Sequence, residues 1–318
     1  MSGTLAIGID IGGTKIAAGV VDEDGRVLVR HDADTPATDP AAVLGAIGDI
    51  VDRLRRDHEV RAVGIGAAGF VDESGSRVLF APHLAWRDAP LRDEVARRTG
   101  LPVVVENDAN ASGWAEWRFG AVQGEAHVVL VTLGTGIGGA IVIDGMPYRG
   151  GHGIAGEFGH MQVVPDGLPC DCGNRGCWEQ YASGRVLTRR GRAAAEAGTP
   201  LGGRLLEAAA GSVDQIRGLH VTAAARDGDE EATTWLADVG DWLGVGVANL
   251  AAALDPGVVV VGGGLCDAGD LLLEPARAAF SRSLTGRGHR PLARIVVAGL
   301  GADAGLIGAA DLARTQDG

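Results

Sequence analysis

Short apolar runs separated by glycine-containing turns fill the start of the chain. Residues 5–9 and 16–21 flank a turn at 12–14, and the pair Asp24-Gly25 then leads into a third apolar run at 27–29. Apolar runs of this length, ended by Gly, Asp and Thr, are typical of β-strands joined by hairpins. The chain is therefore predicted to open with three strands.

Helical and strand patterns then alternate. Asp39 is suited to a helix N-cap and Pro40 to the first helical position, which predicts a helix over residues 39–56. Further along, a helix is expected from about Pro90 to Gly100 and another over 109–119. Buried strands are expected between these helices, and the alternation indicates an α/β fold with a mixed sheet. These strands are residues 63–67 and 103–105.

The opening pattern recurs later in the chain. An apolar run at 128–132, a turn at 134–136, an apolar run at 139–143 and the pair Asp144-Gly145 follow in the same order. Such self-similarity indicates two related domains, as does a length of 318 residues, although any α/β hairpin has a similar pattern. We expect a small domain of residues 1–112 plus about 303–318, and a large domain of 113–302, meeting at a cleft.

The remainder of the chain is mostly helical in pattern. Helices are predicted over 184–198, 201–211 and 230–254, and a final one over 305–314. Two more apolar runs fit buried strands in the second domain, at residues 258–261 and 295–298.

Composition excludes several functional classes. Lys+Arg total 28 and Asp+Glu 41, a net charge of −13 that disfavours general binding to nucleic acid or anionic membranes. The longest uncharged apolar stretch, 128–143, is too short to span a bilayer. No basic region precedes the first apolar run, so we expect no signal peptide and a soluble cytoplasmic protein. The 52 glycines, over twice the usual share of about 7%, indicate backbone that turns tightly or approaches a ligand closely.

Three glycine-rich turns each follow a predicted strand. Their residues are 10–15 (D-I-G-G-T-K), 133–139 (L-G-T-G-I-G-G) and 261–265 (V-G-G-G-L). Glycine lets backbone N–H groups converge on a phosphate, and Asp10 could hold Mg²⁺ through water. The alternative is that these are tight hairpins and close helix contacts with no ligand.

Polar side chains directly follow the strand at 103–105. Asp108 could accept a hydroxyl proton there, and Asn107 could hold hydroxyl groups, because ligands in α/β folds bind at the carboxyl ends of strands. The alternative is that one of them only caps the following helix.

Three cysteines and a histidine have the spacing of a metal site. Cys170, Cys172 and Cys177 read C-x-C-x₄-C, and His160 lies ten residues upstream. Three thiolates and one imidazole complete a tetrahedral, structural Zn²⁺ shell. A reduced cysteine patch without metal is the alternative, and the acidic charge disfavours a DNA-binding finger. Cys266 stands apart and fits a small buried apolar residue.

Two carboxylates flank this cluster. Glu157 precedes it and Glu179 follows it. Carboxylates accept hydrogen bonds from neighbouring hydroxyl groups, so both are candidates for sugar recognition. The alternative is that they are solvated surface side chains.

Taken together, the motifs resemble those of the ROK family of sugar kinases and sugar-responsive repressors, within the hexokinase/actin-like fold. The resemblance spans essentially the whole chain, is greatest to the glucokinase branch of actinobacteria, and implies two actin-like (ribonuclease H-like) α/β domains with mixed sheets flanking a cleft. The motifs are D-I-G-G-T-K at 10–15, E-N-D-A-N at 106–110, L-G-T-G-I-G-G at 133–139, E-F-G-H at 157–160 and C-D-C-G-N-R-G-C-W-E at 170–179.

The resemblance also implies an activity and a role for each motif. It implies that ATP, with Mg²⁺, phosphorylates glucose at the 6-hydroxyl, Asp108 acting as general base. The implied sugar contacts are Asn107, Asp108, Glu157, His160, Glu179 and, through its backbone, Gly69; the zinc ligands His160, Cys170, Cys172 and Cys177; and the nucleotide-side residues Asp10, Gly12, Gly13, Thr14, Lys15, Gly134, Thr135, Gly136, Gly262, Gly263 and Gly264.

Other substrates, another phosphoryl donor and a non-catalytic function fit the same motifs. The same motifs serve kinases of N-acetylmannosamine, fructose or allose, polyphosphate could replace ATP, and a non-catalytic sugar-sensing regulator shares the fold. Residues 1–5 lead straight into the first strand, so we expect no helix-turn-helix of the repressor type. By analogy with the family we expect a homodimer or homotetramer.

Overall fold

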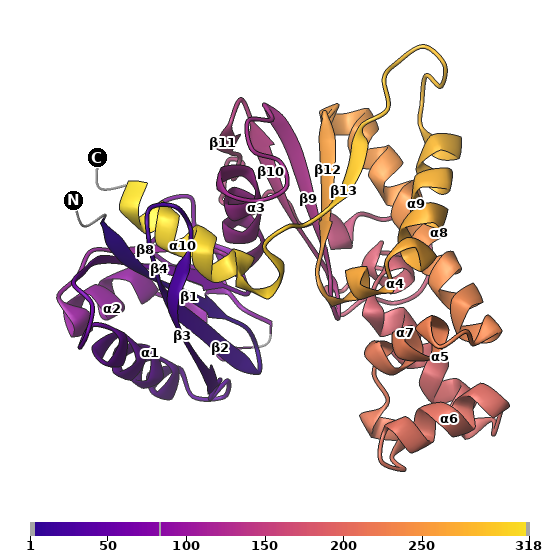
Figure 1. Ribbon diagram of the computed structural model, residues 1–318, viewed down its shortest axis with the longest axis horizontal. Helices are drawn as coiled ribbons and strands as arrows, with labels where there is room; N and C mark the ends of the chain where they lie inside the picture. The colour runs from indigo at the N-terminus through magenta and orange to yellow at the C-terminus, as the bar shows by residue number, and fades with distance from the viewer. Residues whose placement is uncertain (1–3, 83, 316–318) are drawn as a thin grey trace. The chain divides into compact units, whose positions relative to one another are not determined.

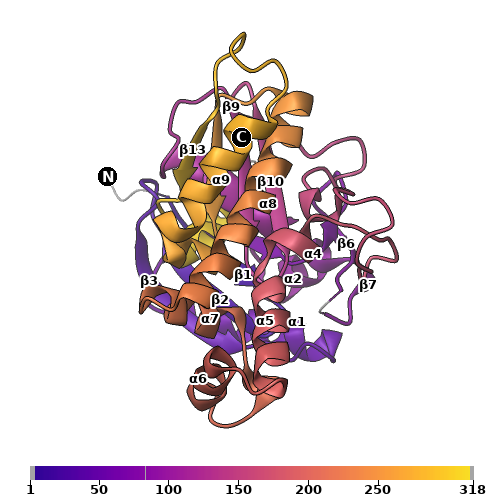
Figure 2. The same ribbon diagram turned by 90° about the vertical axis from the view of Figure 1, so that its right-hand side faces the viewer.

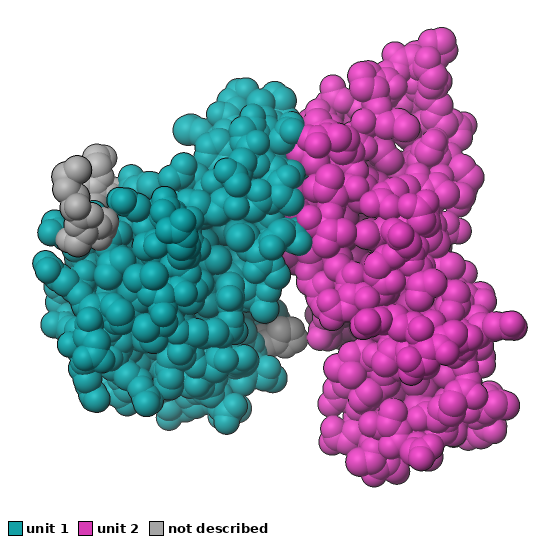
Figure 3. All heavy atoms as spheres, in the orientation of Figure 1, with its two compact units in different colours: residues 1–129, 140–156, 298–318 teal, residues 130–139, 157–297 magenta. Residues whose placement is uncertain are grey.

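The computed structural model describes residues 4–82 and 84–315 of the chain, divided into two compact units. Unit 1 comprises residues 1–129, 140–156 and 298–318, and unit 2 comprises 130–139 and 157–297, less the residues outside the described ranges (Figure 3). The predicted boundaries near 112 and 302 remain predictions.

Unit 1 is built on a five-stranded mixed sheet in the order β3-β2-β1-β4-β8 (Figure 1). β1 pairs antiparallel with β2 and parallel with β4, and β4 pairs parallel with β8. The carboxyl ends of β1, β4 and β8 therefore lie at the same edge of the sheet. The strands are β1 (Leu5–Ile11), β2 (Lys15–Val21), β3 (Val27–Asp34), β4 (Val60–Ala67) and β8 (Val103–Asn107).

Helices cover both faces of this sheet. α1 (Pro40–Leu54) and α2 (Leu91–Thr99) bury their apolar stripes against one face. Asp39 caps α1 by accepting from two backbone N–H groups, as predicted, and α2 ends where Gly100 adopts the left-handed conformation that glycine favours.

The opposite face carries α3 (Asp108–Arg118) and α10 (Ala304–Thr315). Glycines let α10 approach the sheet and α3 at backbone distance. A Cβ on Gly8 would collide with the carbonyl of Leu306, and one on Gly308 with that of Ala111. This close packing makes the C-terminal helix part of the first unit.

A small antiparallel sheet in unit 1 was not predicted. β5 (Phe70–Val71), β6 (Val78–Phe80) and β7 (Arg87–Ala89) have two or three residues each. Segments this short have no periodicity that a sequence can reveal.

The second five-stranded sheet has the order β11-β10-β9-β12-β13. Each strand matches one of the first sheet in sequence order, with β9 in the place of β1 and β13 in the place of β8, so the repeat predicted from the sequence is present in the topology. Its strands are β9 (His127–Leu133), β10 (Ile137–Ile143), β11 (Met146–Pro147), β12 (Val258–Gly262) and β13 (Arg294–Val297).

Between β11 and β12 the chain adds a helical segment (Figure 2). The predicted helix over 230–254 is present as α8 (Glu230–Leu254), because Asp229 caps its start and Asp255 ends it in a left-handed conformation. Gly240 and Gly244 bring α9 (Asp270–Ser283) against it. The other elements between β11 and β12 are α4 (Glu179–Ala182), α5 (Gly184–Glu196), α6 (Pro200–Ala208), α7 (Gly218–Arg226) and the 3₁₀ turns η1 (Phe158–His160) and η2 (Val213–Gln215). Two further 3₁₀ turns follow β12, η3 (Gly264–Ala268) and η4 (Gly301–Asp303).

Helices α4, α7 and α9 were not predicted. Pro275 lies inside α9, and a proline usually argues against a helix interior. Within residues 4–82 and 84–315, no helix combines the length and apolar character needed to cross a membrane.

Candidate functional site

Two carboxylates lie at the shared carboxyl edge of the first sheet. Asp10 is the second-last residue of β1, and Asp108 begins α3 directly after β8. The strand between them keeps them close, because the Cβ position of Gly66 in β4 lies 3.5 Å from the Asp108 Cα. Gly305, at the start of α10, leaves room for the Asp10 carboxylate, which lies 2.6 Å from its Cβ position.

Burial raises the pKa of both carboxyls, and the charge of Asp108 adds to the effect at Asp10. Burial, and then the charge of Asp108, raise the pKa of Asp10 to about 7, against the opposing effect of Arg30. Burial raises the pKa of Asp108 to about 6, against the hydrogen bonds donated by the backbone N–H groups of Ala109 and of Asp108 itself. A proton acceptor poised near neutral pH and a site that favours a cation both follow from this pair.

Asn107 both caps a helix and presents a donor. Its Oδ1 accepts from the N–H groups of Ala109 and Asn110 at 2.9 and 3.0 Å. Its Nδ2 donates to the Gly69 carbonyl oxygen at 3.1 Å. The capping reading and the ligand reading are therefore compatible, since the cap uses only the oxygen, and the structure brings Asn107, Asp108 and Gly69 together.

The turn after β1 is held by backbone bonds and stays partly exposed. The Gly12 N–H donates to the Lys15 carbonyl at 3.0 Å, and the Thr35 hydroxyl donates to the Gly12 carbonyl at 2.9 Å. Gly13 is half-buried and Thr14 is exposed at the tip, and the Thr14 carbonyl accepts from the Thr35 N–H. This leaves the tip of the turn open to a ligand.

Lys15 is paired rather than free. Its Nζ lies 3.0 Å from Asp32 on the neighbouring strand β3, and this bond and one from Arg30 lower the pKa of Asp32. A role of Lys15 toward phosphate stays a prediction.

The turn after β9 is anchored within unit 2. The Gly184 N–H donates to the Gly134 carbonyl at 2.9 Å, and Thr135 is exposed at the tip. A Cβ on Gly134 would meet no described atom within 4 Å, whereas one on Gly136 would lie 2.5 Å from Glu179 Oε2. Of the two glycines, only Gly136 is constrained by a neighbouring side chain.

The third glycine turn packs on the second. Gly263 has φ +88°, and a Cβ there would collide with the backbone of Leu133. Gly262 ends β12 and Gly264 begins η3. Backbone conformation and packing therefore require a glycine at 263. This agrees with the alternative prediction for this turn, a close backbone contact without a ligand.

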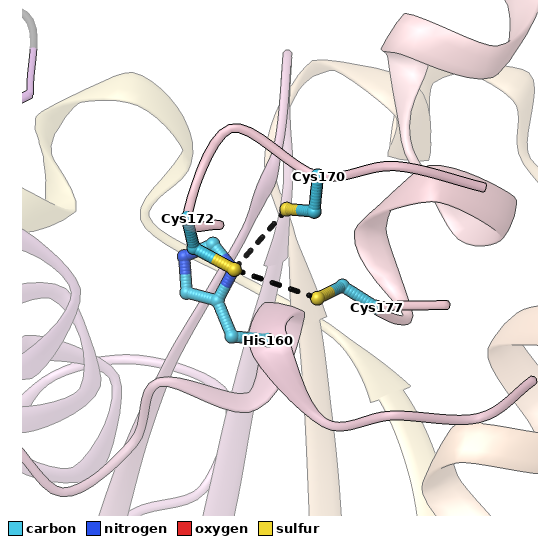
Figure 4. A group of neighbouring side chains, drawn as sticks. All are labelled: His160, Cys170, Cys172 and Cys177. Atoms are coloured by element: carbon cyan, nitrogen blue, oxygen red, sulfur yellow. Dashed lines mark hydrogen bonds between the residues drawn. The ribbon is translucent and has the colours of Figure 1, made fainter. Parts of the chain in front are cut away.

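His160, Cys170, Cys172 and Cys177 form one cluster (Figure 4). Their ligand atoms all lie within 4.8 Å of one another. Cys170 Sγ is 3.7 Å from His160 Nδ1, and Cys172 Sγ is 3.6 Å from Cys177 Sγ. Burial, and then the two neighbouring thiols, raise the pKa of Cys177 to about 12. A divalent cation would reverse this shift, so the donor set suits a thiolate-binding metal.

Glu179 joins this cluster to the glycine turn after β9. It is buried at the start of α4, and its Oε1 accepts from Cys170 Sγ at 3.3 Å while its Oε2 faces Gly136. Glu157 precedes η1, and its carbonyl accepts from the His160 N–H. Trp178 fixes this region to α8 by donating from Nε1 to the Trp242 carbonyl at 2.8 Å.

The predicted site residues thus form two groups. Asp10, Gly12–Lys15, Gly69, Asn107 and Asp108 belong to unit 1, whereas the residues of the second and third turns, Glu157, Glu179 and the cysteine cluster belong to unit 2. A cleft between the domains remains a prediction.

One buried pair at the site was missed by the sequence reading. Glu106 accepts from Arg149 Nε at 2.5 Å, 43 positions away in the chain. The only sequence signal was that Glu106 begins the E-N-D motif.

Comparison with known proteins assigns the family. The ROK family model matches residues 6–316. The chain belongs to the ROK family. Among curated ROK relatives, a glucokinase from Streptomyces coelicolor is 51% identical over 313 residues, 98% of each chain.

Solved ROK structures share the fold. A ROK family glucokinase from Streptomyces griseus, in complex with glucose and AMPPNP, matches with TM-score 0.90 and 53% identity over 98% of this chain and 99% of that one. A ROK family transcriptional regulator, a homologue of the E. coli Mlc protein, matches with TM-score 0.85 and 28% identity over 98% of this chain but 78% of that one. These matches and the two mixed sheets confirm the predicted actin-like α/β fold.

Proposed function

We propose that this protein is a glucokinase, which transfers the γ-phosphoryl group of ATP to the 6-hydroxyl of glucose. The observation that carries the proposal is the Asp108 carboxylate at the carboxyl end of β8, poised near neutral pH beside Asp10 and the oriented Asn107 amide. The Streptomyces coelicolor relative is a glucokinase, and the Streptomyces griseus structure holds glucose and a nucleotide analogue, which supports this substrate pair.

In the proposed reaction Asp108 accepts the proton of the attacking hydroxyl. The free hydrogen on Asn107 Nδ2 donates to a sugar oxygen, because its Oδ1 is engaged by the helix. Glu157, His160 and Glu179 supply further hydroxyl contacts. Phosphoryl transfer depends mainly on positioning and charge stabilisation, which the backbone N–H groups of the two exposed glycine turns provide.

Mg²⁺ fits the carboxylate edge. Asp10 is a hard oxygen donor whose ionised form is disfavoured by burial and by Asp108, so a cation there restores its charge. Bound Mg²⁺ would neutralise the phosphate charge that develops during transfer.

Zn²⁺ fits the Cys/His cluster. Three sulfurs and one imidazole nitrogen within 4.8 Å of one another match the closed shell of a structural zinc. His160 would bind it through Nδ1, which faces Cys170, and its Nε2 would remain for the sugar. The metal would therefore fix His160 directly, and Glu179 through the backbone, because Glu179 begins α4 two residues after the ligand Cys177.

A non-catalytic regulator is the competing function, because a transcriptional regulator shares the fold. The paired carboxylates Asp10 and Asp108 favour the kinase, since a sensor needs no proton acceptor. We also propose that the protein is cytoplasmic, forms a homo-oligomer and has no nucleic-acid or membrane partner. Light scattering of the purified protein tests the oligomeric state.

A coupled ADP assay tests the activity. We expect ADP release with glucose and MgATP, and slower release with N-acetylmannosamine, fructose, allose or with polyphosphate as donor. No glucose-dependent ADP release, together with measurable glucose binding, would assign the regulator function instead.

A further inference from the structure

An ion pair between a buried carboxylate and a half-buried guanidinium lies next to Asn107 in unit 1. The Arg149 guanidinium donates from Nε to Glu106 Oε2 at 2.5 Å, and the side chains are 27% and 4% exposed. An isolated buried charge is costly, so the Glu106 carboxylate depends on Arg149 for its counter-charge. Neither residue belongs to the proposed catalytic or sugar-binding set.

The second oxygen of Glu106 organises the start of α3. Glu106 Oε1 accepts from the Asn107 N–H at 3.0 Å and from Asn110 Nδ2 at 3.0 Å. It thereby fixes the residue before Asp108 and the first turn of the helix that carries Asp108. The carboxylate thus joins Arg149 to the backbone from which the sugar-binding amide projects.

The Asn107 amide is oriented by the same contacts. The Asn107 N–H is held by Glu106 and its Oδ1 by two helix N–H groups, which directs Nδ2 toward the Gly69 carbonyl. The segment after Arg149 is folded back on itself, because the Ala155 N–H donates to the Arg149 carbonyl at 3.0 Å. Arg149 therefore approaches Glu106 from an ordered loop.

We propose that Arg149 is a positioning residue that acts through Glu106 to set the affinity for the sugar, with little effect on phosphoryl transfer. The inference rests on the proposed function. Without Arg149, the Glu106 carboxylate loses its counter-charge and turns toward solvent, and Asn107 loses the hydrogen bond that fixes its backbone.

Steady-state kinetics and calorimetry of Arg149→Met test the proposal. We expect KM for glucose and the Kd for glucose without nucleotide to rise about tenfold, with kcat within about threefold and KM for ATP unchanged. Arg149→Lys keeps the charge and recovers part of the loss. Arg77→Met, which removes an exposed ion pair with Asp88 in the same unit, is the matched control and leaves all constants unchanged.

The double variant Glu106→Gln with Arg149→Met separates positioning from simple destabilisation. A glutamine at 106 accepts the same two hydrogen bonds without a charge that needs Arg149, so KM for glucose returns to within about threefold of wild type. The double variant also serves if Arg149→Met alone does not fold.

Two results would overturn the proposal. Either glucose KM in Arg149→Met equals that of wild type, or the double variant binds glucose as weakly as Arg149→Met does. Both results are compared with a wild-type protein that is active. A wild type that releases no ADP with glucose would instead reject the proposed function itself.

Discussion

The two glycine hairpins of the molecule have the same length, but only the first has charged residues beside its turn. In each, a seven-residue strand, a three-residue turn and a second seven-residue strand follow one another: β1 and β2 in the first, β9 and β10 in the second. Asp10 is second-last in β1, where β9 has Thr132, and Lys15 begins β2, where β10 has Ile137. The repeat therefore preserved backbone geometry while charge was kept only in the first hairpin.

Their surroundings differ accordingly. The first hairpin ends beside a second carboxylate, Asp108, whereas the second is joined through Gly136 and Glu179 to the Cys/His cluster. In the proposed function the first copy supplies the cation ligand beside the proton acceptor, and the second joins the phosphate turn to the cluster proposed to contact the sugar. This division can be broken at four points.

The largest effect is expected at Asp108, the carboxylate beside the charged hairpin. Asp108→Asn removes the proton acceptor and lowers kcat at least about 10²-fold, the lower range for acid–base catalysis, while glucose still binds. The coupled ADP assay and calorimetry measure the two effects. Near-normal turnover would show that Asp108 is not the base.

The next effect is expected at the metal cluster. Cys172→Ala, or chelation, releases one zinc per chain and weakens glucose binding about 10- to 100-fold, because Glu179 and His160 lose their orientation. Cys266→Ala, away from the cluster, is the control. Elemental analysis that finds no zinc in wild type would reject the assignment.

The acid side of the pH profile reports on Asp108. Because burial raises the pKa of Asp108 to about 6, kcat/KM falls with protonation below that pH and is about tenfold lower at pH 5. The fold is not lost through this group, since a raised carboxyl pKa favours the folded state at low pH and disfavours it as pH rises. Circular dichroism at pH 5 checks this, and a profile flat to pH 4.5 would contradict the assignment.

The smallest effect separates two glycines of one turn. Gly136→Ala displaces the Glu179 carboxylate and raises KM for glucose several-fold, about three- to tenfold, although this turn faces the nucleotide in the proposed function. Gly134→Ala has open space at its Cβ and raises KM for ATP instead. The same response to both substitutions would mean that Glu179 does not connect the turn to the sugar.

Much of this architecture could be predicted from local sequence. Helix 230–254 was predicted to its last residue because the pair Asp255-Pro256 marks its end. Strand β3 extends five residues beyond its predicted end, since its alternating Arg30–Asp34 segment is polar and largely exposed. Local signals identify elements whose ends carry caps or turns.

The site residues could be predicted where a local sequence pattern marks them. The cysteine spacing and the position of Asp108 after an apolar strand are visible in the chain, and the structure gathers the first and places the second at a strand end. Arg149 with Glu106, and Gly136 with Glu179, are separated by 43 residues each and meet only through tertiary folding. No local pattern marks such pairs.

The packing of α10 against β1 and α3 has a consequence for synthesis. Leu306, Ile307 and Ala310 complete an apolar cluster that includes Ala6 and Val21. Strands β1 and β2 are therefore synthesised long before the helix that closes their cluster, and the segment 157–297 emerges from the ribosome between them. A nascent chain that ends before α10 would lack the helix that covers this face of the first sheet.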